Sequence, residues 1–325
     1  MKYLLRKVAL YLLIAWSAIT LNFLVPRLMP GDPVTLLVER MQGRIDPDAM
    51  AAIAESYGLT DDPIHIQYVA YLRDLLHGDL GLSIGFHPTP VADIVAQSLP
   101  WTIGLVGITT IISFIVGTGL GVVLAWRRGS WTDHLLPTLT FLNAVPYFWM
   151  ALILVLVLAV NLDWFPVAGA YELGLERGWN AEFIGSVIYH GALPALTIVL
   201  ASFAGWVLAM RNMTVTILGE EYVTMAEAKG LPRRMVMLNY AARNAILPSV
   251  TGFALALGAV VGGSMLTEVI FNYPGVGYTL FQAVQNQDFP LMQGLFLIIS
   301  LTVIVANLCA DIVYIFLDPR TRQEA

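Results

Sequence analysis

Long apolar runs separated by short polar segments dominate the pattern of this chain. Six runs contain no Asp, Glu, Lys or Arg and approach or exceed the length of a membrane-spanning helix: 8–26, 94–126, 135–162, 191–210, 244–267 and 289–310. A helix needs about 20 apolar residues to cross the hydrocarbon layer of a bilayer. The pattern therefore predicts an all-α integral membrane protein with six transmembrane helices, the last continuing past Asp311 to Leu317.

Composition supports a lipid-facing surface. Hydrophobic residues make up 58% of the chain and charged residues 12%, whereas soluble domains carry about 25% charged residues. The net charge of −6 comes without a basic run, so nucleic acid is not an expected partner. Cys309, the single cysteine, cannot form an intrachain disulfide, and no Cys/His cluster has metal-ligand spacing. We expect no metal site, no catalytic residue and no bound cofactor in this chain.

The first apolar run resembles a signal peptide, because Lys2, Arg6 and Lys7 precede it. Pro26 and Arg27 follow it in place of a small-residue cleavage site, so we interpret the run as an uncleaved span. With the N-terminus inside, 12 of the 17 Lys and Arg residues fall on the cytoplasmic side and 5 on the outer side. Because cytoplasmic loops are enriched in basic residues, the prediction is N-in and C-in.

Four segments follow from these spans: 1–30 with the first span, 31–98 as an extracytoplasmic helical insertion, 99–317 as a five-helix core with a cytoplasmic loop at 211–244, and 318–325 as a cytoplasmic tail. The insertion is predicted to hold three short helices, which begin near Asp46, Asp62 and Thr89, each followed by proline. An apolar stripe along the second helix is expected to pack on the membrane domain; the alternative is a docking surface for an extracytoplasmic partner. This stripe consists of Ile66, Val69, Leu72 and Leu76.

Small residues at four-residue spacing occur within two of the spans. Gly117 and Gly121 form one pair, and Gly258 and Gly262 form the other. This spacing allows helix backbones to approach closely and indicates a packed helical bundle.

The loop at 211–244 contains a short predicted helix. Glu220 and Glu221 mark its start and Lys229 its end, as the helix dipole favours. Gly230 suits the left-handed residue after the helix, and Pro232 then begins another helix. A helix of about two turns is unstable alone in water. It must be buried, either against this chain's own helix ends or in a groove of a separate protein.

Here the sequence resembles a known family. The segments 221–231 and 242–248 are similar to the EAA loop of ATP-binding-cassette (ABC) importer permeases, in particular the B-type permease of the dipeptide/oligopeptide family. Further similar motifs lie in the same order along nearly the whole chain: 30–33, 78–81, 127–130, 193–196, 273–277 and 307–320. Two features depart from the general consensus. Of the three name-giving positions, Thr224, Met225 and Ala226, only Ala226 is kept, and Gly230 to Pro248 spans 18 positions, as in the peptide group.

The resemblance implies a type I ABC importer architecture in the prokaryotic inner membrane. It also implies a coupling helix that seats in a cleft of a cytoplasmic ATPase through Glu221, Tyr222, Val223, Met225, Ala226, Ala228 and Gly230. The implied partners are a second permease subunit, two ATPase subunits that hold ATP and Mg, and an extracytoplasmic substrate-binding protein. The implied cargo is a peptide, an oligosaccharide or a nickel chelate.

Two other classes of function are weighed against this interpretation. An ion-coupled secondary transporter would show internal repeats, and no clear repeat is present. A membrane enzyme would need paired acids or a nucleophile with its base at bilayer depth, whereas Asp311 stands alone within its span. The chain also lacks a Gly-x-x-x-x-Gly-Lys-Ser/Thr phosphate loop, so we expect it neither to bind ATP nor to be an enzyme.

The sequence leaves the roles of several polar or aromatic residues undecided. Asp311 is expected to pair with a polar neighbour or to reach water, and Glu268 to be a solvated helix end, with an external gate as the alternative. Four residues are either interface anchors or part of a solute path, which itself stays undetermined: Asn143, Tyr147, Trp149 and Trp206.

Overall fold

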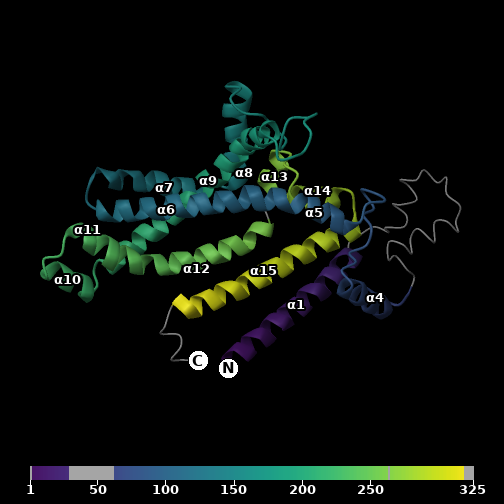
Figure 1. Ribbon diagram of the computed structural model, residues 1–325, viewed down its shortest axis with the longest axis horizontal. Helices are drawn as coiled ribbons and strands as arrows, with labels where there is room; N and C mark the ends of the chain where they lie inside the picture. Colours follow the sequence, from purple (N-terminus) through teal and green to yellow (C-terminus); the bar gives the residue numbers. More distant parts are fainter. Residues whose placement is uncertain (1, 29–61, 263, 318–325) are drawn as a thin grey trace. The chain divides into compact units, whose positions relative to one another are not determined.

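The computed structural model describes residues 2–28, 62–262 and 264–317 (Figure 1). Within these ranges the regular elements are helices, apart from an isolated bridge between Leu82 and Pro90. The predicted all-α class is therefore confirmed. The helix predicted near Asp46 and the tail at 318–325 lie outside the described residues. The helices form two compact units, and each unit is presented by itself.

The described residues contain five helices that are long and apolar enough to cross a membrane: Lys7–Val25, Val91–Trp126, Ala181–Ile217, Arg233–Gly262 and Phe289–Cys309. A bent pair, Trp131–Ala144 and Tyr147–Asn161, gives a sixth if it is counted as one span. The predicted six spans agree with this upper count.

The third predicted span is not one straight helix. Helix α7 (Leu135–Ala144) and helix α8 (Tyr147–Leu154), with its π-helical continuation Val155–Asn161, form the pair that is bent by 100°. Pro146 lies at the break, and Val145 before it has an extended ψ of 125°. Proline lacks an N–H and its ring excludes the preceding residue from the helical region. The apolar run predicted the length of this segment but not its change of direction.

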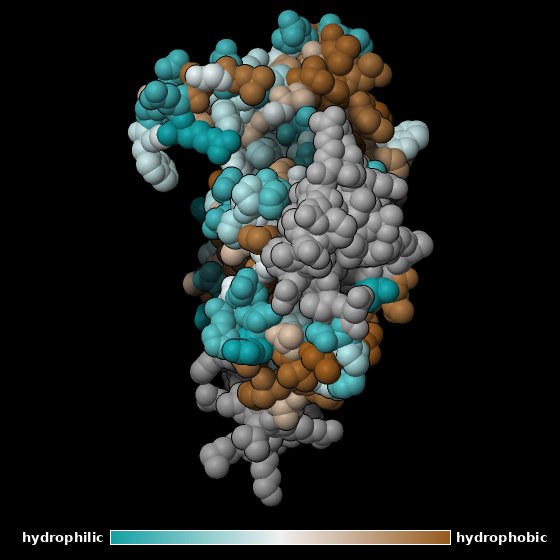
Figure 2. Space-filling view, turned by 90° about the vertical axis from the view of Figure 1, so that its right-hand side faces the viewer, coloured by the Kyte–Doolittle hydropathy of each residue, from teal (hydrophilic) through white to brown (hydrophobic). Residues whose placement is uncertain are grey.

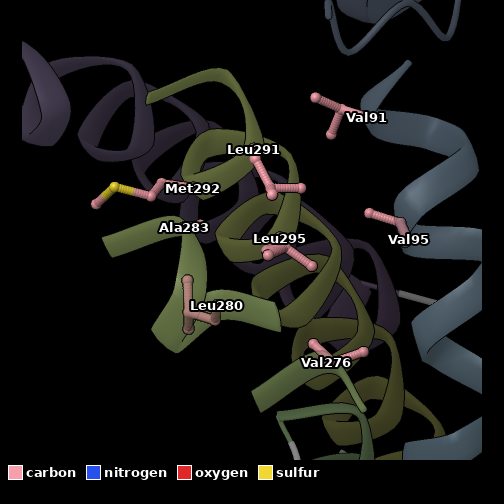
Figure 3. Packing of buried hydrophobic residues seen from close by; sticks show 8 residues of the cluster. All are labelled: Val91, Val95, Val276, Leu280, Ala283, Leu291, Met292 and Leu295. Carbon is pink, nitrogen blue, oxygen red and sulfur yellow. The ribbon is translucent and has the colours of Figure 1, made fainter. Parts of the chain in front are cut away.

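The first unit comprises the described parts of Met1–Thr102, Val261–Met265 and Pro274–Val305. Its helices are α1 (Lys2–Leu28), α4 (Ile64–Leu76), α5 (Val91–Thr102), α14 (Val276–Gln285) and the first part of α15 (Phe289–Leu317). Figure 3 shows its apolar core, which consists of Val91, Val95, Val276, Leu280, Ala283, Leu291, Met292 and Leu295. A Cβ added at Gly294 would collide with the Val91 side chain, so this glycine lets α5 approach α15 closely.

A fully buried carboxylate fixes the loop that precedes α5. Asp288, between α14 and α15, accepts hydrogen bonds from the Ser83 hydroxyl, from the Gly85 amide at 2.8 Å and from the Leu291 amide at 3.2 Å. Buried charge is tolerated only where it is well hydrogen-bonded. These bonds hold the loop 82–90 against the start of α15.

The second unit comprises the described parts of Ile103–Val260, Leu266–Tyr273 and Ala306–Ala325. Helices α6 (Ile108–Trp126), α9 (Ala181–Ile217) and α12 (Arg243–Ala259) form much of it, together with α7 and α8 (Figure 1).

The predicted glycine pairs have unequal roles in the packing. A Cβ on Gly117 would lie 2.9 Å from the Phe203 carbonyl oxygen, and one on Gly121 2.7 Å from the Val207 carbonyl oxygen. The close approach of α6 and α9 therefore needs both glycines. A Cβ on Gly258 would collide with Ala306, whereas one on Gly262 would only reach ordinary contact with Ile299 at 3.5 Å. The prediction is confirmed for the first three glycines, and Gly262 is not a site of close backbone approach.

Two helices are longer than their apolar runs. Helix α9 has 37 residues, beginning after the cap residue Asn180 and continuing beyond Arg211, whereas the predicted span covered 191–210. The fifth span begins at Arg233 and not at residue 244. A run without charges marks the hydrocarbon region, while the helices themselves continue into polar surroundings. Helix α15 continues past Asp311 to Leu317, the last described residue, whereas its candidate span covers Phe289–Cys309.

Candidate functional site

The short helix predicted in the loop 211–244 is present as α10 (Glu221–Ala228), which has eight residues. Glu220 precedes it with extended backbone angles (φ −75°, ψ 146°), and its side chain makes no capping hydrogen bond. The carboxylates of Glu220 and Glu221 therefore act on this end through the helix dipole, which favours negative charge there.

Gly230 closes α10. Its φ of +75° lies in the left-handed region, as predicted. The Gly230 amide donates to the Glu227 carbonyl oxygen at 2.9 Å, and the Leu231 amide donates to the Ala226 carbonyl oxygen at 3.4 Å. These two bonds form a Schellman cap, which satisfies carbonyl groups that a helix end otherwise leaves unpaired. The end of α10 is thus defined by its backbone.

One face of α10 is buried within the chain. Val223 and Ala226 are almost inaccessible, Ala226 being 2% exposed, and both pack with Val236. Partly buried neighbours complete this cluster: Ile217, Leu218, Leu231 and Tyr240. For this face, packing against the chain's own helix ends is the correct alternative. Val223 and Ala226, which were predicted to contact a partner, are covered by this chain in the structure.

The opposite face of α10 is open. Met225 is 61% exposed, and Glu221, Tyr222, Ala228 and Gly230 are exposed as well. Of the seven predicted docking residues, five therefore remain accessible, and two belong to the inner face. The Tyr222 hydroxyl accepts a hydrogen bond of 3.1 Å from the side-chain carboxamide of Asn244 at the start of α12. Sequence reasoning missed Asn244, because no local pattern reveals a contact across 22 residues.

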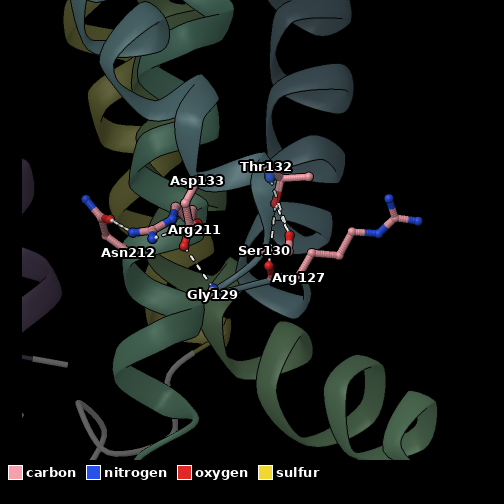
Figure 4. Close-up of polar contacts among 7 residues, drawn as sticks. All are labelled: Arg127, Gly129, Ser130, Thr132, Asp133, Arg211 and Asn212. Carbon is pink, nitrogen blue, oxygen red and sulfur yellow. Dashed lines mark hydrogen bonds and ion pairs between the residues drawn. The ribbon is translucent and has the colours of Figure 1, made fainter.

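Polar contacts connect the surroundings of α10 to the end of α6. The Arg233 guanidinium in α11 (Arg233–Met235) donates to the Trp126 carbonyl oxygen at 3.4 Å. In the turn after α6, Asp133 accepts from the Gly129 amide at 2.8 Å and lies 3.6 Å from the Arg211 guanidinium of α9 (Figure 4). Helix α10 is thus followed along the chain by α11, whose Arg233 contacts the end of α6, while α9 contacts the turn after α6 through Arg211.

The buried state of Glu268 contradicts the expectation of a solvated helix end. Glu268, in α13 (Met265–Ile270), is fully buried, and its carbonyl oxygen accepts from the Tyr273 amide at 2.8 Å. Burial, and secondarily the nearby Glu268 carboxylate, raises the pKa of the Tyr273 phenol to about 12. Tyr273 therefore stays neutral at physiological pH, and both side chains belong to the interior of their unit.

The other residues singled out in the sequence are not gathered into one site. The Asn143 carboxamide oxygen would lie 2.8 Å from a Cβ on Gly205 of α9, while Tyr147 and Trp149 are exposed. Trp206 packs edge to face on Phe114, with ring centroids 5.2 Å apart. Asp311 is half-buried in α15, two residues beyond the end of the span at Cys309.

Comparison with known proteins agrees with this architecture. The model of the family "Binding-protein-dependent transport system inner membrane component" matches residues 117–323. The oligopeptide transport system permease protein AppB of Bacillus subtilis is 34% identical over 98% of this chain and 98% of its own. The dipeptide transport system permease protein DppB of Escherichia coli is 32% identical over 100% and 99%, respectively. A probable peptide ABC transporter permease protein, y4tP of Sinorhizobium fredii, is 32% identical over 98% and 99%.

The chain belongs to this family of inner membrane transport components. The predicted resemblance and the inner-membrane location are thereby confirmed. The family supports the importer permease and not the ion-coupled secondary transporter. The relatives are named as permeases of transport systems, which are not themselves enzymes.

Proposed function

We propose that this chain and a second, similar permease subunit form the translocation path of an ABC importer for peptides. Two cytoplasmic ATPase subunits would drive it, and an extracytoplasmic binding protein would deliver the cargo. The peptide assignment draws on the printed functions of the relatives, which are dipeptide, oligopeptide and peptide permeases. The proposed orientation is N-in and C-in, which puts α10 on the side of the ATPases.

The observation that carries this proposal is that α10 is buried on one face and exposed on the other. Its inner face is fixed by the cluster around Val223 and Ala226, while Met225 projects from the open face. A capped helix that is held from one side can transmit a displacement without unfolding. A partner that grips the open face would therefore move α9, which ends at Ile217, and the helical stretch from Arg233 that leads into α12. Closure of the ATPases could bias the bundle between two packings in this way.

In this proposal, the ATPase subunits and not this chain bind the nucleotide. The sequence contains no Gly-x-x-x-x-Gly-Lys-Ser/Thr loop, whose backbone amides would cradle phosphates. ATP and Mg would bind the ATPase subunits, and this chain would hold no cofactor of its own. Purified alone, it is expected to show no saturable ATP hydrolysis.

Two neighbouring substitutions test the docking role of α10. Met225→Glu puts a carboxylate on the open face, so the protein should accumulate and melt as the wild type does. Co-purification of the ATPases and peptide uptake should both fall at least tenfold, since a loss of about 1.4 kcal/mol of docking energy already weakens association tenfold. Ala226→Glu instead buries an unpaired charge within the chain and should lower accumulation and melting temperature.

Glu227→Gln is the control for mutation of an exposed α10 residue. It should leave accumulation, melting temperature, ATPase co-purification and peptide uptake near the wild-type level. If Met225→Glu retains both the ATPases and uptake, the open face of α10 is not the docking surface. The assignment of coupling to this helix would then be wrong.

A further inference from the structure

Helix α4 exposes the apolar stripe that was expected to pack on the membrane domain. Val69 is 65% exposed and Leu76 87% exposed, and Ile66 is exposed as well. No residue of this helix is buried. Leu72 is half-buried, so the expectation is wrong for the three other residues of the stripe, Ile66, Val69 and Leu76.

The opposite side of α4 contacts α1 (Figure 1). The hydroxyl oxygens of Thr20 and Tyr68 are 2.7 Å apart, and the Arg27 guanidinium donates to the Gln67 carboxamide oxygen at 3.1 Å. The Phe23 ring lies between these contacts, with its centroid 5.1 Å from that of Tyr68. With this side against α1, the apolar stripe faces away from the contact.

These contacts set the depth of α4 relative to the bilayer. The apolar span of α1 ends at Val25, so Thr20 lies five residues before its end and Arg27 two residues after it. At a rise of 1.5 Å per residue, the contacts run from about 7 Å inside the end of the span to about 3 Å beyond it. Amphipathic helices at a membrane surface bury their apolar face about 5–10 Å into the boundary between headgroups and acyl chains. The Tyr68 and Gln67 contacts of α4 fall at this level along α1.

The side chains around the stripe suit the same location. Arg73 is exposed between Val69 and Leu76, and a long basic side chain there can extend to lipid phosphates while its stem stays in apolar surroundings. Only 11% of the α1 span is buried, and Leu21 and Val25 near its end are exposed, so the end of this span also presents apolar side chains. Figure 2 faces this end of the molecule and shows hydrophobic and hydrophilic surface side by side below the grey residues.

We infer that α4 is a membrane-surface helix whose residues Ile66, Val69 and Leu76 contact lipid acyl chains next to the end of the first span. Lipid is the occupant favoured both by the level of the contacts with α1 and by Arg73 beside the apolar residues. The contact would hold α4 and its neighbouring segments at a fixed height above the bilayer. This inference does not depend on the cargo or on the docking of ATPases.

Spin-label accessibility tests this inference on the complete transporter in lipid nanodiscs. Cys309 is first replaced by Ser, and single cysteines are introduced as Val69→Cys and Leu76→Cys, with Asp74→Cys as the control on the same helix. Oxygen concentrates in the bilayer, whereas the water-soluble complex NiEDDA is excluded from it. Labels at Val69 and Leu76 should collide more often with oxygen than with NiEDDA, and the label at Asp74 should show the reverse.

Two results would overturn the inference. Preferential collision with NiEDDA at both stripe positions would show that the stripe faces water. Shielding from both reagents, with an immobilised label, would show that protein covers it. Wild-type peptide uptake by cells that produce each cysteine variant establishes that the transporter is intact, and Ile66→Cys replaces either stripe position where uptake is lost.

Discussion

The Leu231 amide donates a 3.4 Å hydrogen bond to the carbonyl oxygen of Ala226, and the side chains of these two residues belong to the same apolar cluster. The two residues that form this cap hydrogen bond of α10 therefore also take part in the packing of its inner face. This arrangement requires the left-handed residue between them, Gly230, because only then can the chain reverse tightly enough.

Gly230→Val should weaken the cap through backbone strain. No heavy atom lies within 4 Å of a Cβ added at Gly230, so steric contact with the rest of the chain is absent in the described structure. A left-handed conformation costs an L-residue about 1–2 kcal/mol, and β-branching increases this cost. Melting temperature and ATPase co-purification should fall for Gly230→Val and stay nearer the wild type for Gly230→Asn, since Asn tolerates positive φ. Equal melting temperatures and equal ATPase co-purification for the two variants would show that the cap does not determine the stability or the docking of α10.

Gly117→Ala should disturb the packing of α6 on α9, whereas Gly119→Ala should not. The new methyl group at Gly117 would lie 2.5 Å from the Trp206 Cβ and 2.9 Å from a backbone oxygen, while nothing lies within 4 Å at Gly119. Overpacking of this kind costs about 1–3 kcal/mol. The measurement is the melting temperature of both variants in the same detergent. A decrease for Gly119→Ala as large as that for Gly117→Ala would contradict close packing as the cause.

Asp288→Ala should loosen the loop 82–90. It removes the acceptor of the Ser83 hydroxyl and of the Gly85 and Leu291 amides. Each buried donor left without a partner costs about 1–3 kcal/mol. Thermal melting and limited proteolysis of the loop should show the loss, and Asp288→Asn should be milder because one oxygen acceptor remains. Asp93→Asn, at an exposed position, is the control and should change melting little.

Local signals were enough to predict α10. Glu221, Lys229, Gly230 and Pro232 lie within twelve positions, and each acts on the backbone next to it. The choice of its buried face was not predictable, because Val223 and Ala226 on one side and Met225 on the other are all apolar or small. The neighbours that decide the face, such as Tyr240, come from the next helix.

The sequence likewise did not predict long-range contacts, the bend of a span or the burial of a residue at the end of an apolar run. Ser83 and Asp288 are 205 positions apart, and nothing near either residue indicates the bond between them. Pro146 was visible, but a count of apolar residues measures the length of a span and not its bend. Glu268 follows an apolar run, as a solvated helix end does, and only the packed structure shows that it is buried.

Cysteine labelling tests the membrane orientation and, with it, whether the bent pair crosses the bilayer. After Cys309→Ser, single cysteines are introduced as Asp74→Cys, Arg128→Cys and Trp179→Cys, all at exposed positions. The excess of basic residues on the cytoplasmic side predicts that a membrane-impermeant maleimide labels Asp74→Cys and Trp179→Cys in spheroplasts and Arg128→Cys only after permeabilisation. Labelling of Arg128→Cys alone before permeabilisation would reverse the orientation and remove α10 from the cytoplasm. Labelling of Asp74→Cys but not of Trp179→Cys would mean that α7 and α8 enter and leave on the same side, so that this pair is re-entrant and the upper count of six spans fails.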